Sequence, residues 1–393
     1  MKEDSKKILL GFADAIAAIE VVFDLLEKGH ELVIFSRRKD STSLAYCKNI
    51  TIEYITAPED NIKDAKKDLL KIIKQNSFDA MMPLDDIALW LCNEIRENIS
   101  IKFIGPTSDG IEIALNKIKQ IDYAKKSGLK VLDTIIISKK TDLDKITFFP
   151  LILKPALAVT VEKNKISKDA FYFISSEEDL AKVKMEWNHK TPYIAQPLIK
   201  GTGEGLFGYF NKKLYAPSSH IRLRMKNPLG SGSSACMNGS INIAEQEIIE
   251  KFLKKIKWTG IFMVEMLKDL ENNYWFMELN GRPWGSMALA RKKNLHYPAW
   301  AVEKAFNASF IPQYRENNDA VIVRHLGRDI IHLLAVLKGS KNKHHVVWPS
   351  RLKTIKDVLL PRKNQWFYNY KKGYLKLFIM DTLITLKNQF IKK

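Results

Sequence analysis

Three oxygen-bearing side chains and one arginine follow one another closely near residues 260–286. Glu265 ends one apolar segment, and Glu278 and Asn280 stand two residues apart in the next one. Side chains on a strand alternate between its faces, so Glu278 and Asn280 are expected to point the same way, and strand pairing would bring Glu265 beside them. Hard oxygen ligands of this kind are typical of a Mg²⁺ site that also holds nucleotide phosphates. Arg282 adds a fixed positive charge for an anion formed during a reaction.

A β-hairpin with scattered surface polar residues is the alternative for this segment. Glu278, however, is flanked by large apolar residues, namely Trp275, Phe276, Met277 and Leu279. Such neighbours are mostly buried in folded proteins, which disfavours a simple surface turn. We therefore interpret the segment as a metal site.

Two earlier segments carry further candidates. Lys154 ends the apolar segment Leu-Ile-Leu-Lys-Pro, where a lysine on a rigid strand can reach nucleotide phosphates as a point charge, or can simply be an edge-strand lysine. Gln196, Pro197 and Leu198 follow another apolar segment and are interpreted as a hinge whose backbone hydrogen-bonds a flat base. A glycine-rich strand follows this hinge.

Taken in order, these motifs resemble the ATP-grasp superfamily, and most of all its carbamoyl-phosphate-synthase-like branch, which is often found in polysaccharide or cell-envelope loci. The resemblance extends from about residue 8 to about residue 320. The segments that carry it are Leu153-Lys154-Pro155, Gln196 to Gly205, Arg222-Leu223-Arg224, Gly230 to Ser234, Met263-Val264-Glu265 and Glu278 to Ser286.

The resemblance implies a role for each matching residue. The cofactors would be ATP and Mg²⁺ (or Mn²⁺). The implied assignments are Glu265, Glu278 and Asn280 as metal ligands, Lys117 and Lys154 on the nucleotide phosphates, Gln196, Pro197 and Leu198 at the adenine, Arg282 on an acyl-phosphate, and Arg222 and Arg224 facing the acceptor cleft.

Two departures from the family pattern concern the nucleotide. The position at which members carry an acid for the ribose is Gly203 here, so ribose contact passes to its neighbour Glu204. The phosphate-covering loop, residues 156–166, contains no glycine, so coverage is expected to rely on side chains such as Lys163.

The activity implied by the resemblance is ADP-forming ligation of a carboxylate to an amine through an acyl-phosphate. The small-molecule substrates would be sugars, amino acids or cell-envelope precursors. Two alternatives remain open at this point. One is a nucleotide-binding scaffold at the membrane without ligase chemistry, and the other is an ATP-grasp kinase that phosphorylates a small molecule.

The predicted fold is α/β (α+β). Residues 1–107 are expected to form a parallel α/β pre-ATP-grasp domain, because the sequence opens as strand, helix (13–28) and strand. Residues 108–195 and 196–325 are expected to form the small and large ATP-grasp subdomains, and 326–393 a basic helical extension. Single helices are predicted over 108–127 and 286–307, and a Gly/Ser-rich loop over 227–239.

Three isolated features have plainer interpretations. Asp85 and Asp86 stand just past a strand, where open α/β sheets bind ligands, but a helix cap is favoured. His220 is expected to be structural, and Cys236 is not expected to be a nucleophile. The Gly230 to Ser234 loop either cradles an anion or acts as a lid.

The composition places the charge unevenly. The net charge is +19, and residues 324–393 hold 16 Lys or Arg against 3 Asp or Glu. Three widely spaced cysteines and no apolar run of membrane-spanning length predict a cytoplasmic protein. Residues 374–391 are strongly apolar and are flanked by Lys371, Lys372, Lys392 and Lys393. One interpretation is a helix that packs on the core or on a homodimer partner. The other is a peripheral helix that contacts the inner face of an anionic membrane. Nucleic acid is not expected.

Overall fold

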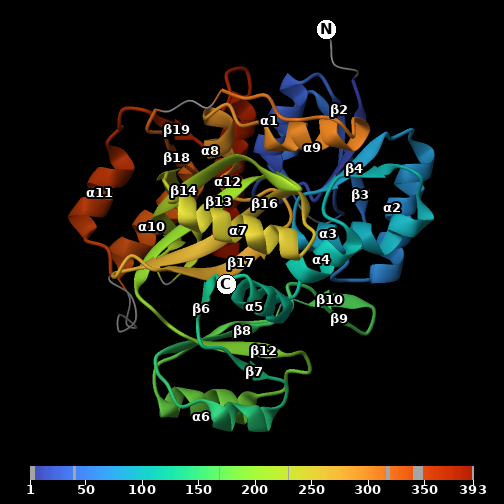
Figure 1. Cartoon of the computed structure of the whole chain (residues 1–393). Helices are drawn as coiled ribbons and strands as arrows, with labels where there is room; N and C mark the ends of the chain where they lie inside the picture. The colour runs from blue at the N-terminus through green and yellow to red at the C-terminus, as the bar shows by residue number, and fades with distance from the viewer. Residues whose placement is uncertain are drawn as a thin grey trace.

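The computed structural model of the chain describes residues 5–38, 41–167, 169–228, 230–315, 319–339 and 348–391 (Figure 1). Within these residues the strands form a five-stranded sheet, a four-stranded sheet, a two-stranded hairpin and an eight-stranded sheet. Helices cover the sheets, so the predicted mixed α/β class is confirmed. Lys392 and Lys393 of the predicted basic tail lie outside the described residues.

The N-terminal sheet has the strand order β3-β2-β1-β4-β5, with neighbouring strands parallel. Parallel strands require crossover connections, which helices supply here. The elements are β1 (Lys7–Gly11), α1 (Ala18–Glu27), β2 (Glu31–Arg37), η1 (Ser43–Tyr46), β3 (Ile50–Ile55), α2 (Ile62–Gln75), β4 (Ala80–Pro83), α3 (Asp86–Ile95), η2 (Arg96–Asn98) and β5 (Lys102–Phe103).

The first helix starts later than the sequence pattern predicts. The Ala13 N–H donates to the Phe35 carbonyl at 3.0 Å, and the Ala15 N–H donates to the Phe12 carbonyl at 3.1 Å. These bonds hold the chain in a turn after β1, so the helix begins at Ala18 instead of residue 13. The turn places residues 13–16 at the carboxyl edge of the sheet.

The helix predicted over 108–127 is interrupted. It forms α4 (Ser108–Ala114) and α5 (Lys117–Lys126). Asn116 lies in extended conformation between them, and its side-chain oxygen accepts hydrogen bonds from Ile118 N–H at 3.0 Å and Lys119 N–H at 3.2 Å. Such an N-cap satisfies free donors at the start of the second helix, so the break is built into the sequence.

The four-stranded sheet, of order β11-β8-β12-β7, is antiparallel, and α6 lies beside it (Figure 1). A separate hairpin, β9-β10, leaves the end of β8. The elements are β7 (Ile135–Ile137), η3 (Lys140–Lys145), β8 (Leu151–Pro155), β9 (Thr160–Glu162), β10 (Lys165–Ser167), β11 (Tyr172–Ile174), α6 (Glu177–Glu186) and β12 (Tyr193–Pro197).

The eight-stranded sheet has the order β19-β18-β15-β14-β13-β16-β17-β6. This sheet combines strands from three of the predicted units. One edge strand, residues 130–131, comes from the predicted small subdomain, the other, residues 365–367, comes from the predicted C-terminal extension, and the strands between them come from the predicted large subdomain. Its strands are β6 (Lys130–Val131), β13 (Gly201–Asn211), β14 (Lys213–Asn227), β15 (Ser231–Asn238), β16 (Thr259–Asp269), β17 (Tyr274–Asn280), β18 (Ile322–Arg324) and β19 (Gln365–Phe367).

Two local predictions in this region are wrong. The segment expected to be a Gly/Ser loop is mostly the strand β15, because it pairs with β14 on one side and β18 on the other. The helix expected over 286–307 is divided into α8 (Met287–Lys292) and α9 (Tyr297–Phe306), with Asn294 at a φ of 62° between them. A left-handed residue ends a helix, and asparagine tolerates this conformation. Helix α7 (Ile243–Lys255) packs its buried Phe252 and Leu253 on the sheet.

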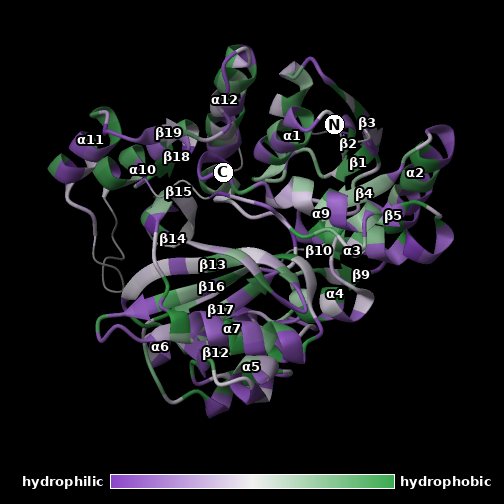
Figure 2. Cartoon of the chain, turned by 45° about the horizontal axis from the view of Figure 1, so that its top comes forward, coloured by the Kyte–Doolittle hydropathy of each residue, from purple (hydrophilic) through white to green (hydrophobic). Residues whose placement is uncertain are grey.

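The C-terminal part consists of α10 (Leu326–Lys338), α11 (Arg351–Leu359), β19 and α12 (Leu375–Ile391). Helix α12 packs against α10 and η1, with Leu377 fully buried, and Figure 2 shows it standing between α10 and α1. This is the core-packing alternative of the sequence prediction. In the described residues no helix has the length and apolar character needed to cross a membrane.

Candidate active site

The predicted pairing of the acidic strands is present. Glu265 of β16 and Glu278 of β17 lie directly opposite each other in antiparallel register, and we refer to them as the glutamate pair. Asn280 lies two residues beyond Glu278, opposite Met263, and its amide nitrogen is 3.5 Å from a Glu278 carboxylate oxygen. The three predicted ligands therefore occupy one face at the end of this strand pair.

Two lysines are held close to the glutamate pair. Lys154 lies on β8, and Lys117 is the first residue of α5. The Lys117 N–H donates to the Ala156 carbonyl at 2.8 Å, which fixes the start of α5 to the end of β8. Burial lowers the pKa of Lys154, a shift that Glu278 opposes and Lys117 reinforces. These charges interact strongly because they lie in a space shielded from water.

The two carboxylates of the pair respond differently to their neighbours. Burial raises the pKa of Glu265, and the Glu278 charge adds to this shift against the opposing charge of Arg222. Burial also penalises ionised Glu278, but Lys117 and Lys154 outweigh it and hold its pKa below the ordinary value. One carboxylate is thus stabilised as an anion, while the other needs a further cation to ionise fully.

This donor set fits Mg²⁺. Two carboxylates and an amide oxygen are the hard ligands that the ion takes, and it ordinarily keeps other positions for phosphate oxygens or water. No group of three or more His, Cys, Asp or Glu suited to a metal occurs in the part of the chain that the structure describes.

A cavity of about 350 Å³ adjoins the two lysines, and we call it the lysine pocket. Its lining includes Ile152 of β8, Thr160 of β9, Ser167 of β10 and Asp86 of α3. The β9-β10 hairpin thus forms one wall, in the segment where the sequence predicts a phosphate-covering loop.

The tip of the hairpin is attached to the start of α2. The Ile62 N–H donates to the Asn164 carbonyl at 2.8 Å, and the Asn164 side chain bonds the Lys63 N–H at 3.1 Å and the Asn61 side chain at 2.7 Å. Lys163 occupies the same turn, is exposed and does not line the lysine pocket. The expected phosphate coverage by Lys163 is therefore not what the structure shows.

Arg282 is bound to an acid from the N-terminal sheet. Its Nε and Nη2 donate to the two carboxylate oxygens of Asp86, both at 3.1 Å. Asp85 accepts a hydrogen bond from the Ala88 N–H at 2.7 Å, so the predicted cap is Asp85. Asp86 instead lines the lysine pocket, which matches the ligand-edge alternative for a residue past a strand end.

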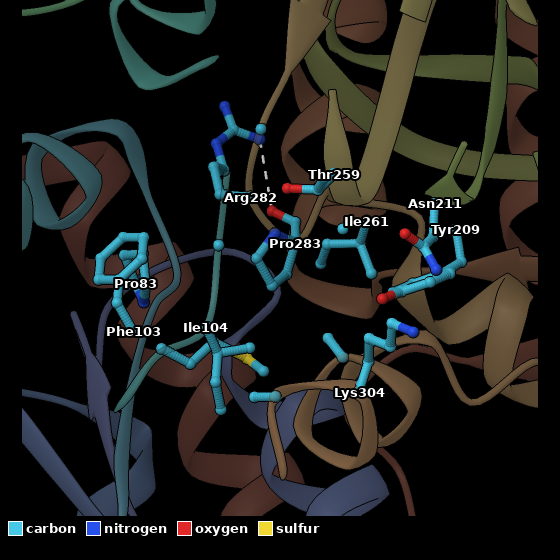
Figure 3. Close-up of a pocket in the computed structure, with 16 residues that line it drawn as sticks. Pro83, Phe103, Ile104, Tyr209, Asn211, Thr259, Ile261, Arg282, Pro283 and Lys304 are labelled. Carbon is cyan, nitrogen blue, oxygen red and sulfur yellow. Dashed lines mark hydrogen bonds between the residues drawn. The ribbon is translucent and has the colours of Figure 1, made fainter. Parts of the chain in front are cut away.

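Arg282 lines a separate cavity of about 190 Å³ (Figure 3). Phe103, Ile104, Ile261 and Pro283 line it. Figure 3 shows the Arg282 guanidinium pointing away from these side chains, with Nη1 donating to the Pro283 carbonyl at 3.4 Å. Asp86, Lys117 and Lys154 line the lysine pocket instead, and we place the candidate chemistry there.

Arg222 and Arg224 were both predicted to face the acceptor cleft, but they bind different partners. Arg222 forms an ion pair with Glu265 and so lies at the glutamate pair. Arg224 instead binds Asp329 of α10 through two hydrogen bonds, of 3.0 and 2.8 Å. A register shift between these residues breaks the strand alternation that would keep them on one face. The prediction for Arg224 is therefore corrected to a buried anchor for the C-terminal part.

The predicted adenine hinge lies at the end of β12. The Gln196 side chain is buried and donates to the Thr134 hydroxyl at 2.9 Å. The Leu198 N–H donates to the Pro150 carbonyl at 2.9 Å, and Pro197 has no N–H. Neither Pro197 nor Leu198 therefore has a backbone N–H left to donate to a base at this hinge.

The prediction that Glu204 contacts a ribose is corrected. A Cβ on Gly203 or Gly205 would touch Arg222 or His220, so these glycines face the glutamate pair. Glu204 lies between them in β13 and therefore points to the opposite face. It is 4% exposed and accepts a hydrogen bond from the Tyr274 hydroxyl at 3.4 Å.

His220 and Cys236 occupy structural positions. Nδ1 of the buried His220 lies 2.8 Å from the Ser286 hydroxyl, and burial lowers the pKa of this histidine to about 3. Burial raises the pKa of the Cys236 thiol to about 12, and its sulfur lies 3.0 Å from the Tyr368 hydroxyl. Both arrangements agree with the sequence interpretation of these two residues.

The paired sheets, the glutamate pair and the two lysines define a chain with the ATP-grasp fold. No family model matches the sequence. A D-alanine–D-alanine ligase of Campylobacter jejuni is 26% identical over 205 residues, which cover 49% of this chain and 57% of that ligase. The match thus spans little more than half of the relative.

Solved structures give the same architecture. An L-amino acid ligase from Bacillus licheniformis aligns with a TM-score of 0.62 and 15% identity over 80% of this chain and 78% of its own. An N5-carboxyaminoimidazole synthetase from Staphylococcus aureus aligns with a TM-score of 0.62 and 16% identity over 88% and 87%. These proteins are ATP-grasp enzymes, and they confirm the fold that the motifs predicted.

Proposed function

We propose that the protein is an ADP-forming ligase that activates a carboxylate with Mg-ATP and joins it to an amine. The observation that carries this proposal is the glutamate pair together with Lys117 and Lys154, which lower the pKa of Glu278 and line the lysine pocket. The fold similarity to proteins named as ligases supports it. Sugars, amino acids and cell-envelope precursors are the proposed substrate classes.

The chain's own residues would act by position and charge. Lys154 and Lys117 would bind the phosphates of ATP, and Arg282 would neutralise charge that spreads over the transferred group. The glutamate pair and Asn280 would hold Mg²⁺ (or Mn²⁺), which would supply positive charge against the phosphates. Transfer of the γ-phosphoryl group to the carboxylate releases ADP, and attack by the amine then expels phosphate and forms the amide.

The products of the reaction test the proposal. Full-length protein with Mg-ATP and a library of acids and amines is expected to release ADP and phosphate in step with amide formation. Release of AMP and pyrophosphate would exclude the acyl-phosphate route. Phosphate retained on the product would identify a small-molecule kinase, and ATP binding without turnover would favour the scaffold alternative.

A pair of matched variants links the products to this site. Glu278→Gln is expected to lower turnover about a hundredfold or more, because it removes a preorganised charge. Glu271→Gln lies in the turn of the same hairpin, is exposed and is expected to leave turnover unchanged. Equal turnover in both variants would contradict the assignment.

We propose that the protein is located in the cytoplasm and binds peripherally to the inner face of an anionic membrane. Leu375, Ile379, Leu383 and Phe390 are exposed on α12, and Lys376 and Lys387 lie among them. Such a face suits peripheral binding to anionic lipid. Co-sedimentation with phosphatidylserine vesicles tests this, and light scattering tests the proposed homodimer.

A further inference from the structure

An ion pair crosses the large sheet to reach the glutamate pair. The guanidinium of Arg222, on β14, contacts a carboxylate oxygen of Glu265, on β16. Strand β13 lies between these two strands and pairs with both of them. The two side chains are 20% and 17% exposed, so the ion pair is largely shielded from water. Charges in such a place interact more strongly than charges on an open surface.

A glycine of β13 clears the path for this ion pair. A Cβ atom on Gly203 would lie 2.8 Å from Cδ of Arg222, which is closer than a real Cβ atom approaches its neighbours. The Arg222 side chain can therefore lie across β13 because the strand carries no side chain at this position. The next glycine along the strand, Gly205, stands directly opposite Glu265. The sheet is thus built to bring the guanidinium to Glu265.

The cations around the glutamate pair are divided between its two members. Lys117 and Lys154 are the cations that interact most strongly with Glu278. For Glu265 the strongest cation is Arg222, and the interaction with Lys154 is smaller. The two lysines line the lysine pocket, whereas Arg222 reaches its carboxylate across β13. Each carboxylate of the pair thus has a positive neighbour that the chain itself supplies.

Arg222 therefore opposes the binding of a metal by the same pair. Glu265 would share its carboxylate between the guanidinium and a divalent cation on the glutamate pair. Two cations on one carboxylate repel each other, so Arg222 lowers the affinity of the pair for the metal. Nucleotide phosphates add negative charge and oxygen ligands to the site, so this repulsion matters less when a nucleotide is bound.

We propose that Arg222 is an internal counter-ion that occupies Glu265 in place of the metal, and that it makes metal binding depend on the nucleotide. Arg222 gives up Glu265 only when phosphates bring further negative charge to the site. The protein then takes up Mg²⁺ together with ATP instead of binding the free ion first. The identity of the nucleotide rests on the proposed ligase function, whereas the competition for Glu265 concerns any divalent cation.

Titration of the full chain with Mn²⁺ tests this, with free Mn²⁺ measured by electron paramagnetic resonance. Without nucleotide the wild type is expected to bind weakly, and Arg222→Met is expected to bind at least about tenfold more tightly. With ADP at saturation the difference is expected to shrink to about threefold or less, because the phosphates offset the arginine. Lys213→Met removes an exposed cation from the start of the same strand and is expected to leave Mn²⁺ binding unchanged.

Two further variants decide whether Arg222 acts through Glu265. Adding Arg222→Met to Glu265→Gln is expected to change Mn²⁺ affinity by less than about threefold, because the shared carboxylate is gone. Gly203→Ala keeps the guanidinium but places a methyl group against its stem, so it is expected to strengthen Mn²⁺ binding as Arg222→Met does. Should Arg222→Met fail to fold by circular dichroism, Gly203→Ala takes its place in every comparison.

Three outcomes would overturn the proposal. They are equal or weaker Mn²⁺ binding in Arg222→Met than in the wild type, an undiminished difference in the presence of ADP, and a full gain in the Glu265→Gln background. These titrations involve no turnover, so failure of the ligase assay leaves their result intact. Absence of Mn²⁺ binding in every protein, with and without ADP, would remove the metal site and with it both proposals.

Discussion

The guanidinium of Arg282 and the carboxylate of Asp86 join two sheets at the reactive edge. Two hydrogen bonds of 3.1 Å connect them, one from Nε and one from Nη2. Asp86 starts α3 beside the N-terminal sheet, and Arg282 follows β17 of the large sheet. Asp86 and the nearby Glu278 raise the pKa of Arg282 despite its burial, so the arginine is a fixed cation.

This relationship predicts that the shape of the arginine matters as well as its charge. In Arg282→Lys the positive charge remains, but a lysine cannot make two parallel bonds to Asp86. We expect kcat/KM for ligation to fall at least tenfold, with a smaller change in the KM of ATP, measured by ADP release. Arg38→Lys, at an exposed ion pair with Asp68, is the control, and an equal effect in both would contradict the prediction.

The raised pKa of Asp85 predicts that the stability of the protein depends on pH. Burial raises the pKa of its carboxyl to about 6, against an ordinary value near 3.8. The folded protein therefore binds more protons than the unfolded chain between these values, and this residue makes stability fall as pH rises from about 4 to about 6. The effect is at most about 2 kcal/mol, because Asp85 keeps part of its surface exposed.

Asp85→Asn should remove that dependence. The amide oxygen can still accept the Ala88 N–H, so the cap of α3 is retained. We expect the free energy of unfolding of the variant to exceed that of the wild type at pH 7.5 and to approach it near pH 4. Urea titrations at several pH values measure this, and parallel curves for the two proteins would refute it.

We predict that loosening the attachment of the β9-β10 hairpin weakens the binding of ATP. Asn164 has a φ of 63°, which glycine accepts, so Asn164→Gly removes the side-chain bonds to α2 and leaves the turn intact. We expect the KM of ATP to rise about threefold to tenfold, because the hairpin is held less firmly over the lysine pocket. Lys212→Gly makes the same change at a φ of 63° in the β13-β14 turn, and there the KM should not move.

We predict that substitution of Glu204 leaves nucleotide binding unchanged. Burial raises the pKa of this carboxyl, and its side chain faces away from the glutamate pair. Glu204→Gln preserves the shape and is expected to leave the KM of ATP within about twofold of the wild type. Lys154→Met, in the lysine pocket, is expected to raise it at least tenfold. A tenfold rise in Glu204→Gln would restore the ribose role.

The sequence by itself determined the local arrangement of the site. Strand alternation placed Glu278 and Asn280 on one face, and the order of the motifs predicted the fold. Asn116 caps α5 and interrupts the single helix that we predicted over 108–127, a break that a capping rule applied to Asn116 could have located. These features depend on backbone geometry over a few residues, so they are readable without the tertiary structure.

Only the tertiary structure decided the partners of the charged residues. Arg222 and Arg224 are two apart in the sequence, but a register shift in β14 sends one to Glu265 and the other to Asp329. Likewise, the Ser43 hydroxyl of η1 donates to Asp381 of α12 only because α12 packs against η1 in the folded chain. Such contacts join residues that are far apart in the sequence, and their energies depend on packing and burial that no local pattern encodes.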